Sequence, residues 1–345
     1  MKKTLAGFLL GLVIALSLTL LAGENPFHIA GILFNSAFGS RYDLGLTLFY
    51  TTPLIFCGLS VALAFHAGLF NIGAEGQLTV ATLTAAAIGV LFPNVPFPLA
   101  PILALAGALA MGAFWGFIAG WLRAVRGSHE VIVTIMLNFI AAGLTSWFTL
   151  QVIPNPNSQN PETAPVGAGY LLKDYDLVAR FFPDTPVSAA LVIAILVAVS
   201  VWVLLWKTSF GYELRTVGAN PEAANRAGIS EKKIRIWAMG LAGALAGFVA
   251  LAEVMGSAGQ FKVGFSADYG FIGIAVALLA QNNPLGVIVA AFLMGALHKG
   301  ASDLDLETTT ITRDFSKIIQ SLIILGVASH GLWVWKMKQK KETKS

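Results

Sequence analysis

The sequence predicts an all-α fold, a polytopic membrane helical bundle with about ten transmembrane helices. Composition is the first reason, because 56% of the 345 residues are hydrophobic and only 12% are charged. A soluble domain is roughly a quarter charged. The second reason is a series of apolar runs of about 20 residues, the length that a helix needs to cross the bilayer core. We therefore expect the whole chain, residues 1–345, to form a single transmembrane domain.

The candidate spans are residues 4–22, 44–65, 77–92, 97–122, 131–150, 189–206, 234–255, 269–280, 285–297 and 315–335. The first follows Lys2 and Lys3 and so resembles a secretory signal, but the residues before Glu24 suit cleavage poorly and we expect a retained helix. The eighth and ninth are short and only four residues apart. They form either two full spans or a pair of helices broken near mid-depth.

Lysine and arginine predict the orientation. With ten spans and a cytoplasmic N-terminus, the C-terminus is also cytoplasmic, and the inside holds 15 of the 22 basic residues, as the positive-inside rule expects. These are Lys2, Lys3, Arg123, Arg126, Lys207, Arg215, Arg226, Lys232, Lys233, Arg235, Lys336, Lys338, Lys340, Lys341 and Lys344. The loop 151–188 is then extracytoplasmic, the loop 207–232 is cytoplasmic, and 336–345 is a basic cytoplasmic tail. The net charge of +4 thus indicates membrane orientation and no nucleic-acid partner.

Small residues recur at four-residue spacing on two predicted helices. Gly112, Gly116 and Gly120 form one stripe, and Gly243 and Gly247 form another. Such stripes let helix backbones approach closely inside a membrane. We interpret them as packing surfaces of a compact bundle.

The junction between the second and third spans, residues 65–77, combines three glycines with Asn71, Glu75 and Gln77. It is either an ordinary cytoplasmic turn, in which Asn71 and Gln77 cap helices and Glu75 is in water, or a broken-helix element that lines the transport path. In the second case Glu75 needs a partner, such as a backbone nest or His66, because a buried carboxylate is costly.

The fifth span places Thr134, Asn138, Ala141 and Thr145 on one face. A polar stripe on a spanning helix either holds helices together or contacts solute, and Asn138 is the better candidate for solute contact because an amide both donates and accepts hydrogen bonds. Glu253 lies near the outer end of the seventh span, where we expect water. The histidines are scattered, so we predict neither a metal site nor a cofactor.

Two catalytic motifs are missing from the sequence. Lys207, Thr208 and Ser209 lack the glycines of a phosphate-binding loop, and no Gly-x-Ser-x-Gly elbow occurs. We therefore expect a non-catalytic chain that does not hydrolyse ATP by itself.

Four motifs carry a family resemblance. The loop sequence Glu222-Ala223-Ala224, with Gly228 four residues later, resembles the EAA coupling loop of bacterial ABC importer permeases. Together with residues 71–77, 127–138 and 211–218, it resembles the branched-chain amino acid and simple-sugar permease superfamily, and most of all the longer of two paired permeases in nucleoside (purine and simple sugar) importers. The resemblance covers roughly residues 40 to 335.

The resemblance implies a type II ABC importer membrane domain in the bacterial cytoplasmic membrane. It implies three partners: a cytoplasmic ABC ATPase, a second, related permease subunit and an extracytoplasmic solute-binding lipoprotein. A short helix around 221–227 would dock on the ATPase, the alternative being a merely solvated basic loop. The residues assigned to ATPase coupling are Gly211, Arg215, Pro221, Glu222, Ala223, Ala224 and Gly228, and those assigned to the substrate pathway are Asn71, Glu75, Gln77, Thr134 and Asn138.

The solute is predicted from the resemblance alone. A nucleoside is favoured, and ribose or another simple sugar is the alternative. A second alternative is an ion-coupled secondary transporter, which should carry paired acids within the membrane; here only Glu75 and Glu253 are candidates.

Overall fold

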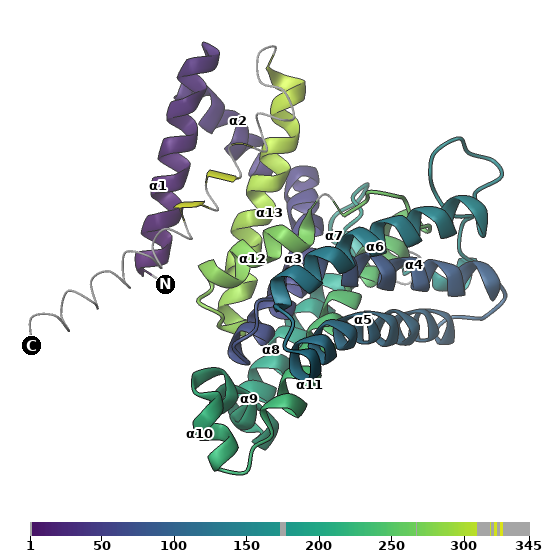
Figure 1. Cartoon of the computed structure of the whole chain (residues 1–345). Helices are drawn as coiled ribbons and strands as arrows, with labels where there is room; N and C mark the ends of the chain where they lie inside the picture. The colour runs from purple at the N-terminus through teal and green to yellow at the C-terminus, as the bar shows by residue number, and fades with distance from the viewer. Residues whose placement is uncertain are drawn as a thin grey trace, which may run out of the picture.

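The computed structural model describes residues 2–172, 177–266 and 268–308, together with residues 318, 321–322 and 325–326. These residues form an α-helical bundle (Figure 1). The tenth predicted span, 315–335, falls almost wholly outside the described residues, and the tail 336–345 falls entirely outside them.

The elements, in chain order, are α1 (Lys2–Leu18), η1 (Thr19–Ala22), α2 (Pro26–Phe38), α3 (Arg41–His66), α4 (Ala74–Leu91), α5 (Leu99–Arg126), α6 (Glu130–Gln151), η2 (Ala168–Tyr170), α7 (Leu177–Phe181), α8 (Ala190–Lys207), α9 (Ser209–Ala219), α10 (Pro221–Arg226), α11 (Glu231–Gly247), the π-helix η4 (Leu251–Ala258), α12 (Tyr269–Leu279) and α13 (Pro284–Glu307). Among the described residues, seven helices are long and apolar enough to cross a membrane: α3, α4, α5, α6, α8, α11 continued by η4, and α13.

Three predicted spans differ from the structure. The first stretch becomes α1 followed by the 3₁₀ turn η1, and its apolar helical part, Gly7–Leu18, is shorter than a full span. The eighth is the short helix α12, whereas the ninth, predicted as 285–297, continues as α13 to Glu307. The pair 269–297 is therefore one short helix and one full-length helix. Asn283 ends the turn between them by accepting hydrogen bonds from the amides of Leu285 and Gly286, with Pro284 at the first helical position.

Helix α2 was not predicted. Residues 23–43 lie between the first two predicted spans. There Asn25 accepts a hydrogen bond from the Phe27 amide and Pro26 occupies the first helical position, so a helix begins. Its buried residues Ile29, Ile32 and Leu33 pack toward α13, where Gly300 lies against Leu33. A capped helix of 13 residues was missed because it is shorter than the apolar runs that identify spans.

The predicted packing role of the glycine stripes is confirmed. The most extensive helix contact in the described chain joins α5 and α11. A Cβ atom on Gly112 would collide with the Gly243 carbonyl, one on Gly116 with the Met239 carbonyl, and one on Gly247 would lie 2.8 Å from the Ala108 oxygen. The two helices therefore touch backbone to backbone, the arrangement that stabilises helix pairs without a hydrophobic driving force.

The two ends of the bundle differ. One end carries α9 and α10, which protrude below the long helices in Figure 1; we call it the α10 end. At the opposite end, the segment 151–172 folds back over the bundle and pairs with residues 259–263 through bonds such as Thr163 N to Phe261 O, 2.9 Å. There the Tyr170 hydroxyl donates to the Phe92 carbonyl at 3.0 Å, and burial raises the pKa of this phenol above its ordinary value. The hydroxyl therefore remains a donor at neutral pH.

A buried cation joins α3 to α13 at this opposite end. Lys299 is 3% exposed, and its ammonium pairs with Asp303 on its own helix and lies 3.6 Å from Asp43 Oδ1 near the start of α3. Two carboxylates thus compensate a charge that would be costly to bury alone.

Candidate functional site

Helix α9 packs tightly against the end of α8. Thr208 caps α9 by accepting a hydrogen bond from the Gly211 amide at 3.1 Å, and a Cβ atom on Gly211 would lie 2.6 Å from the Leu205 carbonyl. The Arg215 guanidinium lies 4.2 Å from the centre of the Trp206 ring, a cation–π contact, and its Nε donates to the Gly211 carbonyl at 3.3 Å. Gly211 and Arg215 therefore fix the position of α9 on the bundle.

Helix α10 is defined by short-range signals. Asn220 accepts a hydrogen bond from the Ala223 amide at 3.1 Å, and Pro221 stands at the first helical position. The helix ends in a Schellman motif: the Ile229 amide donates to the Ala224 carbonyl and the Gly228 amide to the Asn225 carbonyl. Gly228 has φ +81, a left-handed conformation that glycine adopts without cost. The predicted short helix is therefore confirmed, and the EAA motif with its downstream glycine is a helix with its own stop signal.

Only one residue of α10 faces inward. Ala224 is fully buried against the bundle, whereas Glu222, Ala223 and Arg226 are exposed. The helix thus presents an acid, a base and a small residue to whatever lies beyond the α10 end.

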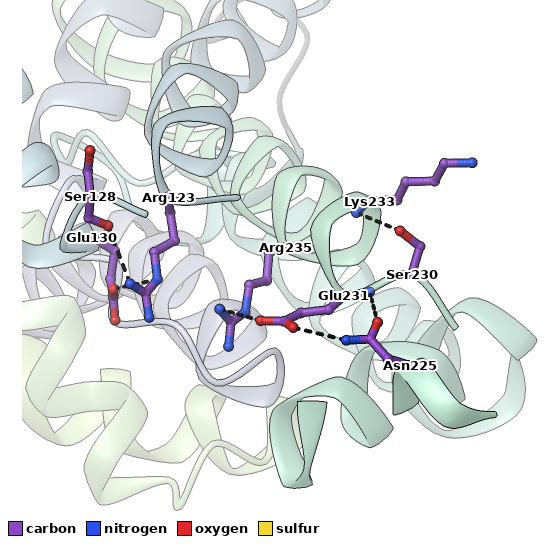
Figure 2. A network of polar contacts seen from close by, with 8 residues as sticks. All are labelled: Arg123, Ser128, Glu130, Asn225, Ser230, Glu231, Lys233 and Arg235. Carbon is purple, nitrogen blue, oxygen red and sulfur yellow. Dashed lines mark hydrogen bonds and ion pairs between the residues drawn. The ribbon is translucent and has the colours of Figure 1, made fainter. Parts of the chain in front are cut away.

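A polar network ties α10 to α11 (Figure 2). The Asn225 amide donates to Glu231 Oε2 at 3.3 Å and accepts from the Glu231 backbone amide at 3.2 Å, and Glu231 pairs with Arg235 at 2.7 Å. Beside it, Arg123 at the end of α5 pairs with Glu130 at the start of α6, 3.1 Å. Because Asn225 bonds both the backbone and the side chain of Glu231, a displacement of α10 must act on the start of α11.

Helix α9 also touches the end of α3. A Cβ atom on Gly218 would collide with the His66 carbonyl and lie 2.9 Å from the Gly68 amide nitrogen. The His66 imidazole meets the α12–α13 turn through Nε2, 3.0 Å from the Asn282 carbonyl oxygen. The segment that follows α3 is thus clamped between α9 and that turn at the α10 end.

From there the chain runs into the interior before α4 begins. Asn71 and Gln77, both almost fully buried, form a reciprocal amide pair: each side chain donates to the other, at 2.9 and 3.1 Å. Asn71 also donates to Ser60 Oγ at 3.2 Å. Their amide groups hold the non-helical segment 67–73 against α3, so that its polar backbone is covered by protein.

Asn138 of α6 closes the same junction from the other side. Its amide donates to the Ile72 carbonyl at 3.0 Å and accepts from the Gly76 amide at 2.9 Å. The Thr134 hydroxyl bonds carbonyls of its own helix, and its Cβ would lie 3.0 Å from a Cβ on Gly73. Asn138 lies eight residues past the start of α6, about 12 Å along the helix axis, so α4 begins well inside the bundle.

The Glu75 carboxylate bridges two interrupted helices. It accepts hydrogen bonds from the Ser266 hydroxyl and from the Gly270 amide, the latter at 2.7 Å, and thereby satisfies an amide at the N-terminus of α12. A Cβ atom on Gly270 would lie 2.6 Å from Glu75 Cα, so the backbones of α4 and α12 meet directly. We call the group Asn71, Glu75, Gln77, Thr134, Asn138, Ser266 and Gly270 the mid-bundle junction.

Comparisons with known proteins identify the family. A family model described as branched-chain amino acid transport system / permease component matches residues 43–328. The chain belongs to this family. The permease is 37% identical over 331 residues to the guanosine ABC transporter permease protein NupP of Bacillus subtilis, covering 94% of this chain and 92% of that protein. It is 35% identical to the nucleoside ABC transporter permease protein NupB of Lactococcus lactis, covering 93% and 88%. It is 34% identical to the glucose ABC transporter permease protein TsgB13 of Haloferax volcanii, covering 87% and 80%.

The structure gathers the five predicted pathway residues of the permease around one junction. It decides between alternatives that the sequence left open at Asn71, Gln77 and Glu75, and it corrects the expectation for Glu253. Asn71 and Gln77 bond each other and do not cap helices; α4 has Gly73 at its N-cap and no side-chain cap. His66 is not the partner of Glu75. Glu253 does not point into water at the helix end, because its Oε1 is buried.

Several residues that matter in the permease were missed. Ser266 and Gly270 carry no local motif, and only their contact with Glu75 in space reveals them. Asn225 could have been found, since it precedes Glu231 by six residues, within reach across the tight turn that Gly228 signals. Among the described residues, no group of three or more His, Cys, Asp or Glu side chains is placed to hold a metal ion.

Proposed function

We propose that this permease forms the translocation path for a nucleoside in an ABC importer and that a separate cytoplasmic ATPase drives it. The observation that carries the solute class is the similarity, over nine-tenths of the chain, to permeases named for guanosine and for nucleosides. The seven long apolar helices within the described part of the chain support a membrane-spanning role.

Coupling rests on the exposed face of α10. Glu222, Ala223 and Arg226 dock in a groove of the ATPase, with Arg226 toward acidic surface, while Pro221, Ala224 and Gly228 shape the helix. Gly211 and Arg215 hold α9, the helix that precedes α10, against the end of α8. Movement of α10 then reaches α11 through Asn225 and Glu231, and reaches the end of α3 through the close contact at Gly218.

In this proposal the mid-bundle junction borders the path. Asn71, Gln77, Thr134 and Asn138 use their polar atoms on neighbouring groups of the protein, so they shape the interrupted helices. Glu75 joins the starts of α4 and α12. Interrupted helices that meet inside a bundle are a recurring way to build a transport path.

The α10 end is then cytoplasmic, with both termini on that side of the bacterial cytoplasmic membrane. The loop 151–188 at the opposite end faces an extracytoplasmic solute-binding lipoprotein. A second, related permease subunit completes the path. The charge distribution of the sequence supports this orientation.

A simple sugar is the second candidate solute, because the relative from Haloferax volcanii is named for glucose. A nucleoside contains a sugar ring, so one family fold can serve both. The two candidates differ in whether free ribose competes.

The test is uptake of labelled guanosine or adenosine by cells that lack only this gene, compared with the complemented strain. We expect gene-dependent uptake that needs ATP, persists when an ionophore abolishes the proton gradient, and is not reduced by excess unlabelled ribose. Competition by ribose would indicate that the transported solute is a simple sugar. Loss of uptake when the ionophore is added, but not when ATP is depleted, would indicate a secondary transporter.

Coupling is tested by replacing Glu222–Gly228 with a Gly/Ser linker, or by Glu222→Arg. Both variants should insert into the membrane at the wild-type level, because Glu222 is exposed and Ala224 is the one buried residue that the linker replaces, but uptake should be abolished. Glu307→Arg is the control, since it makes the same charge change at an exposed position at the end of α13, away from α10. Normal uptake by the linker variant would exclude α10 as the coupling helix.

A further inference from the structure

Four side chains from four elements meet inside the bundle beside the mid-bundle junction. They are Tyr50 of α3, Glu253 of η4, Tyr269 of α12 and His298 of α13, and we call them the Glu253–His298 cluster. The Tyr269 hydroxyl lies beside the Glu253 carboxyl group. The His298 ring centre lies 4.8 Å from that of Tyr50 and 5.9 Å from that of Tyr269, both edge to face.

Two polar atoms of this cluster are buried without a partner. Glu253 Oε1 and His298 Nδ1 have no hydrogen-bond partner among the described residues. An unsatisfied buried polar atom is costly, and more so for a charged group, so native proteins seldom keep one without a purpose. As whole residues, Glu253 and His298 nevertheless retain some accessible surface.

The cluster lies deep within the bundle. His298 is 14 residues from the start of α13, about 21 Å along the helix axis, and Tyr50 is nine residues from the start of α3, about 14 Å from the opposite end. Asp268, which precedes Tyr269, is exposed at a comparable depth. An exposed carboxylate within the membrane faces water or protein and not lipid, so the start of α12 borders such a surface.

The backbone around Glu253 is also unusual. Residues Leu251–Ala258 form a π-helix at the end of α11. A π-helical turn is rare and is frequently found at functional sites, since it reorients the side chains that it carries. Here it carries Glu253 toward Tyr269.

We propose that the Glu253–His298 cluster binds the hydroxyl-bearing sugar ring of the solute as it passes through the bundle. Glu253 Oε1 accepts hydrogen bonds from neighbouring hydroxyls, His298 Nδ1 bonds a further polar group, and the rings of Tyr50, Tyr269 and His298 pack against the apolar face of the sugar. This inference rests on the proposed function, and it applies to the sugar of a nucleoside and to a free sugar alike.

The test compares guanosine with 2′-deoxyguanosine and 3′-deoxyguanosine as labelled solutes in cells that contain the intact importer. Glu253→Gln keeps an acceptor for Tyr269 but puts an amide NH₂ where Oε1 stands. We expect KM for guanosine to rise about tenfold, because the solute loses the hydrogen bond that Oε1 accepts. We also expect the preference for guanosine over one of the deoxy analogues to fall by a similar factor.

The change in preference separates solute contact from a structural role, because general damage lowers uptake of all three solutes equally. The strain with the variant permease and the strain with the wild-type permease contain the same solute-binding protein. The selectivity of that protein therefore contributes equally to the solute preference of both strains. His298→Phe, which retains a ring against Tyr50 and Tyr269, is the second variant and should raise KM about fivefold. Glu307→Gln, at an exposed position, is the control and should change nothing.

An unchanged KM and an unchanged preference in Glu253→Gln would overturn the inference while leaving the proposed function intact. If guanosine uptake does not depend on the gene, the nucleoside assignment fails, and ribose against 2-deoxyribose tests the cluster in the same way. If neither solute is transported, the inference is overturned together with the proposed function.

Discussion

Within the α9–α10 segment, helix α10 is shaped by hydrogen bonds between near neighbours in the chain, whereas the mid-bundle junction is closed by hydrogen bonds between residues that lie far apart. In α10 the longest side-chain hydrogen bond, Asn225 to Glu231, spans six residues. At the junction, Asn138 bonds Gly76 across 62 residues and Glu75 bonds Gly270 across 195. The first region can therefore form its own shape, while the second exists only when α4, α6 and α12 have assembled.

This difference separates two kinds of sensitivity. A change in α10 should alter what the helix binds and leave the bundle intact, because only Ala224 is buried there. A change at the junction should weaken the bundle itself, because its polar groups are buried and each serves as the partner of another. Substitutions in the two regions, and at the contact between them, test whether the regions differ in this way.

The largest effect is expected for Glu75→Leu. The substitution removes two hydrogen bonds and leaves the Gly270 amide and the Ser266 hydroxyl without their acceptor, at a cost of about 3 kcal/mol. Its membrane level and the midpoint of its thermal unfolding in detergent should both fall, and uptake with them. Glu75→Gln, which can still accept from Gly270, should lose about 1 kcal/mol. A Leu variant with the wild-type unfolding midpoint would show that the bridge between α4 and α12 does not support the fold.

An intermediate effect is expected for Gly218→Val, at the contact between the two regions. The new side chain would collide with the His66 carbonyl and push α9 from the end of α3, which we expect to cost about 2 kcal/mol. The protein should still insert, yet uptake should fall more than tenfold because movement of α10 no longer reaches the junction. Gly31→Val is the control, since nothing lies within 4 Å of a Cβ at that helical position. Wild-type uptake by Gly218→Val would remove this contact from the coupling route.

The same difference explains what the sequence could predict. Asn220, Pro221 and Gly228 are local helix signals, so the start and end of α10 were predictable. The glycine stripes on α5 and α11 were equally clear, because their spacing alone defines a packing surface.

Contacts across the bundle were not predictable. The sequence places Glu75 in a glycine-rich break, but nothing near it points to Ser266 or Gly270. Glu253 was assigned to water because its helix was taken to end there, whereas the chain continues as a π-helix that keeps Oε1 buried. The partner of a buried polar group depends on which helices become neighbours, and hydrophobic periodicity does not specify that.

The smallest effect is expected for Gly228→Ala, which alters α10 without touching the bundle. Gly228 has φ +81 and no atom lies within 4 Å of a Cβ placed there, so the cost is the left-handed backbone alone, about 1 kcal/mol. The Schellman motif should loosen and the ATPase should bind about fivefold more weakly when it is co-purified with the permease, while the unfolding midpoint stays near the wild-type value. Gly228→Asn should recover part of the loss, because asparagine tolerates the left-handed conformation better than alanine does. If Gly228→Ala instead lowered the unfolding midpoint as much as Glu75→Leu, α10 would be part of the structural core, and the distinction between the two regions would no longer hold.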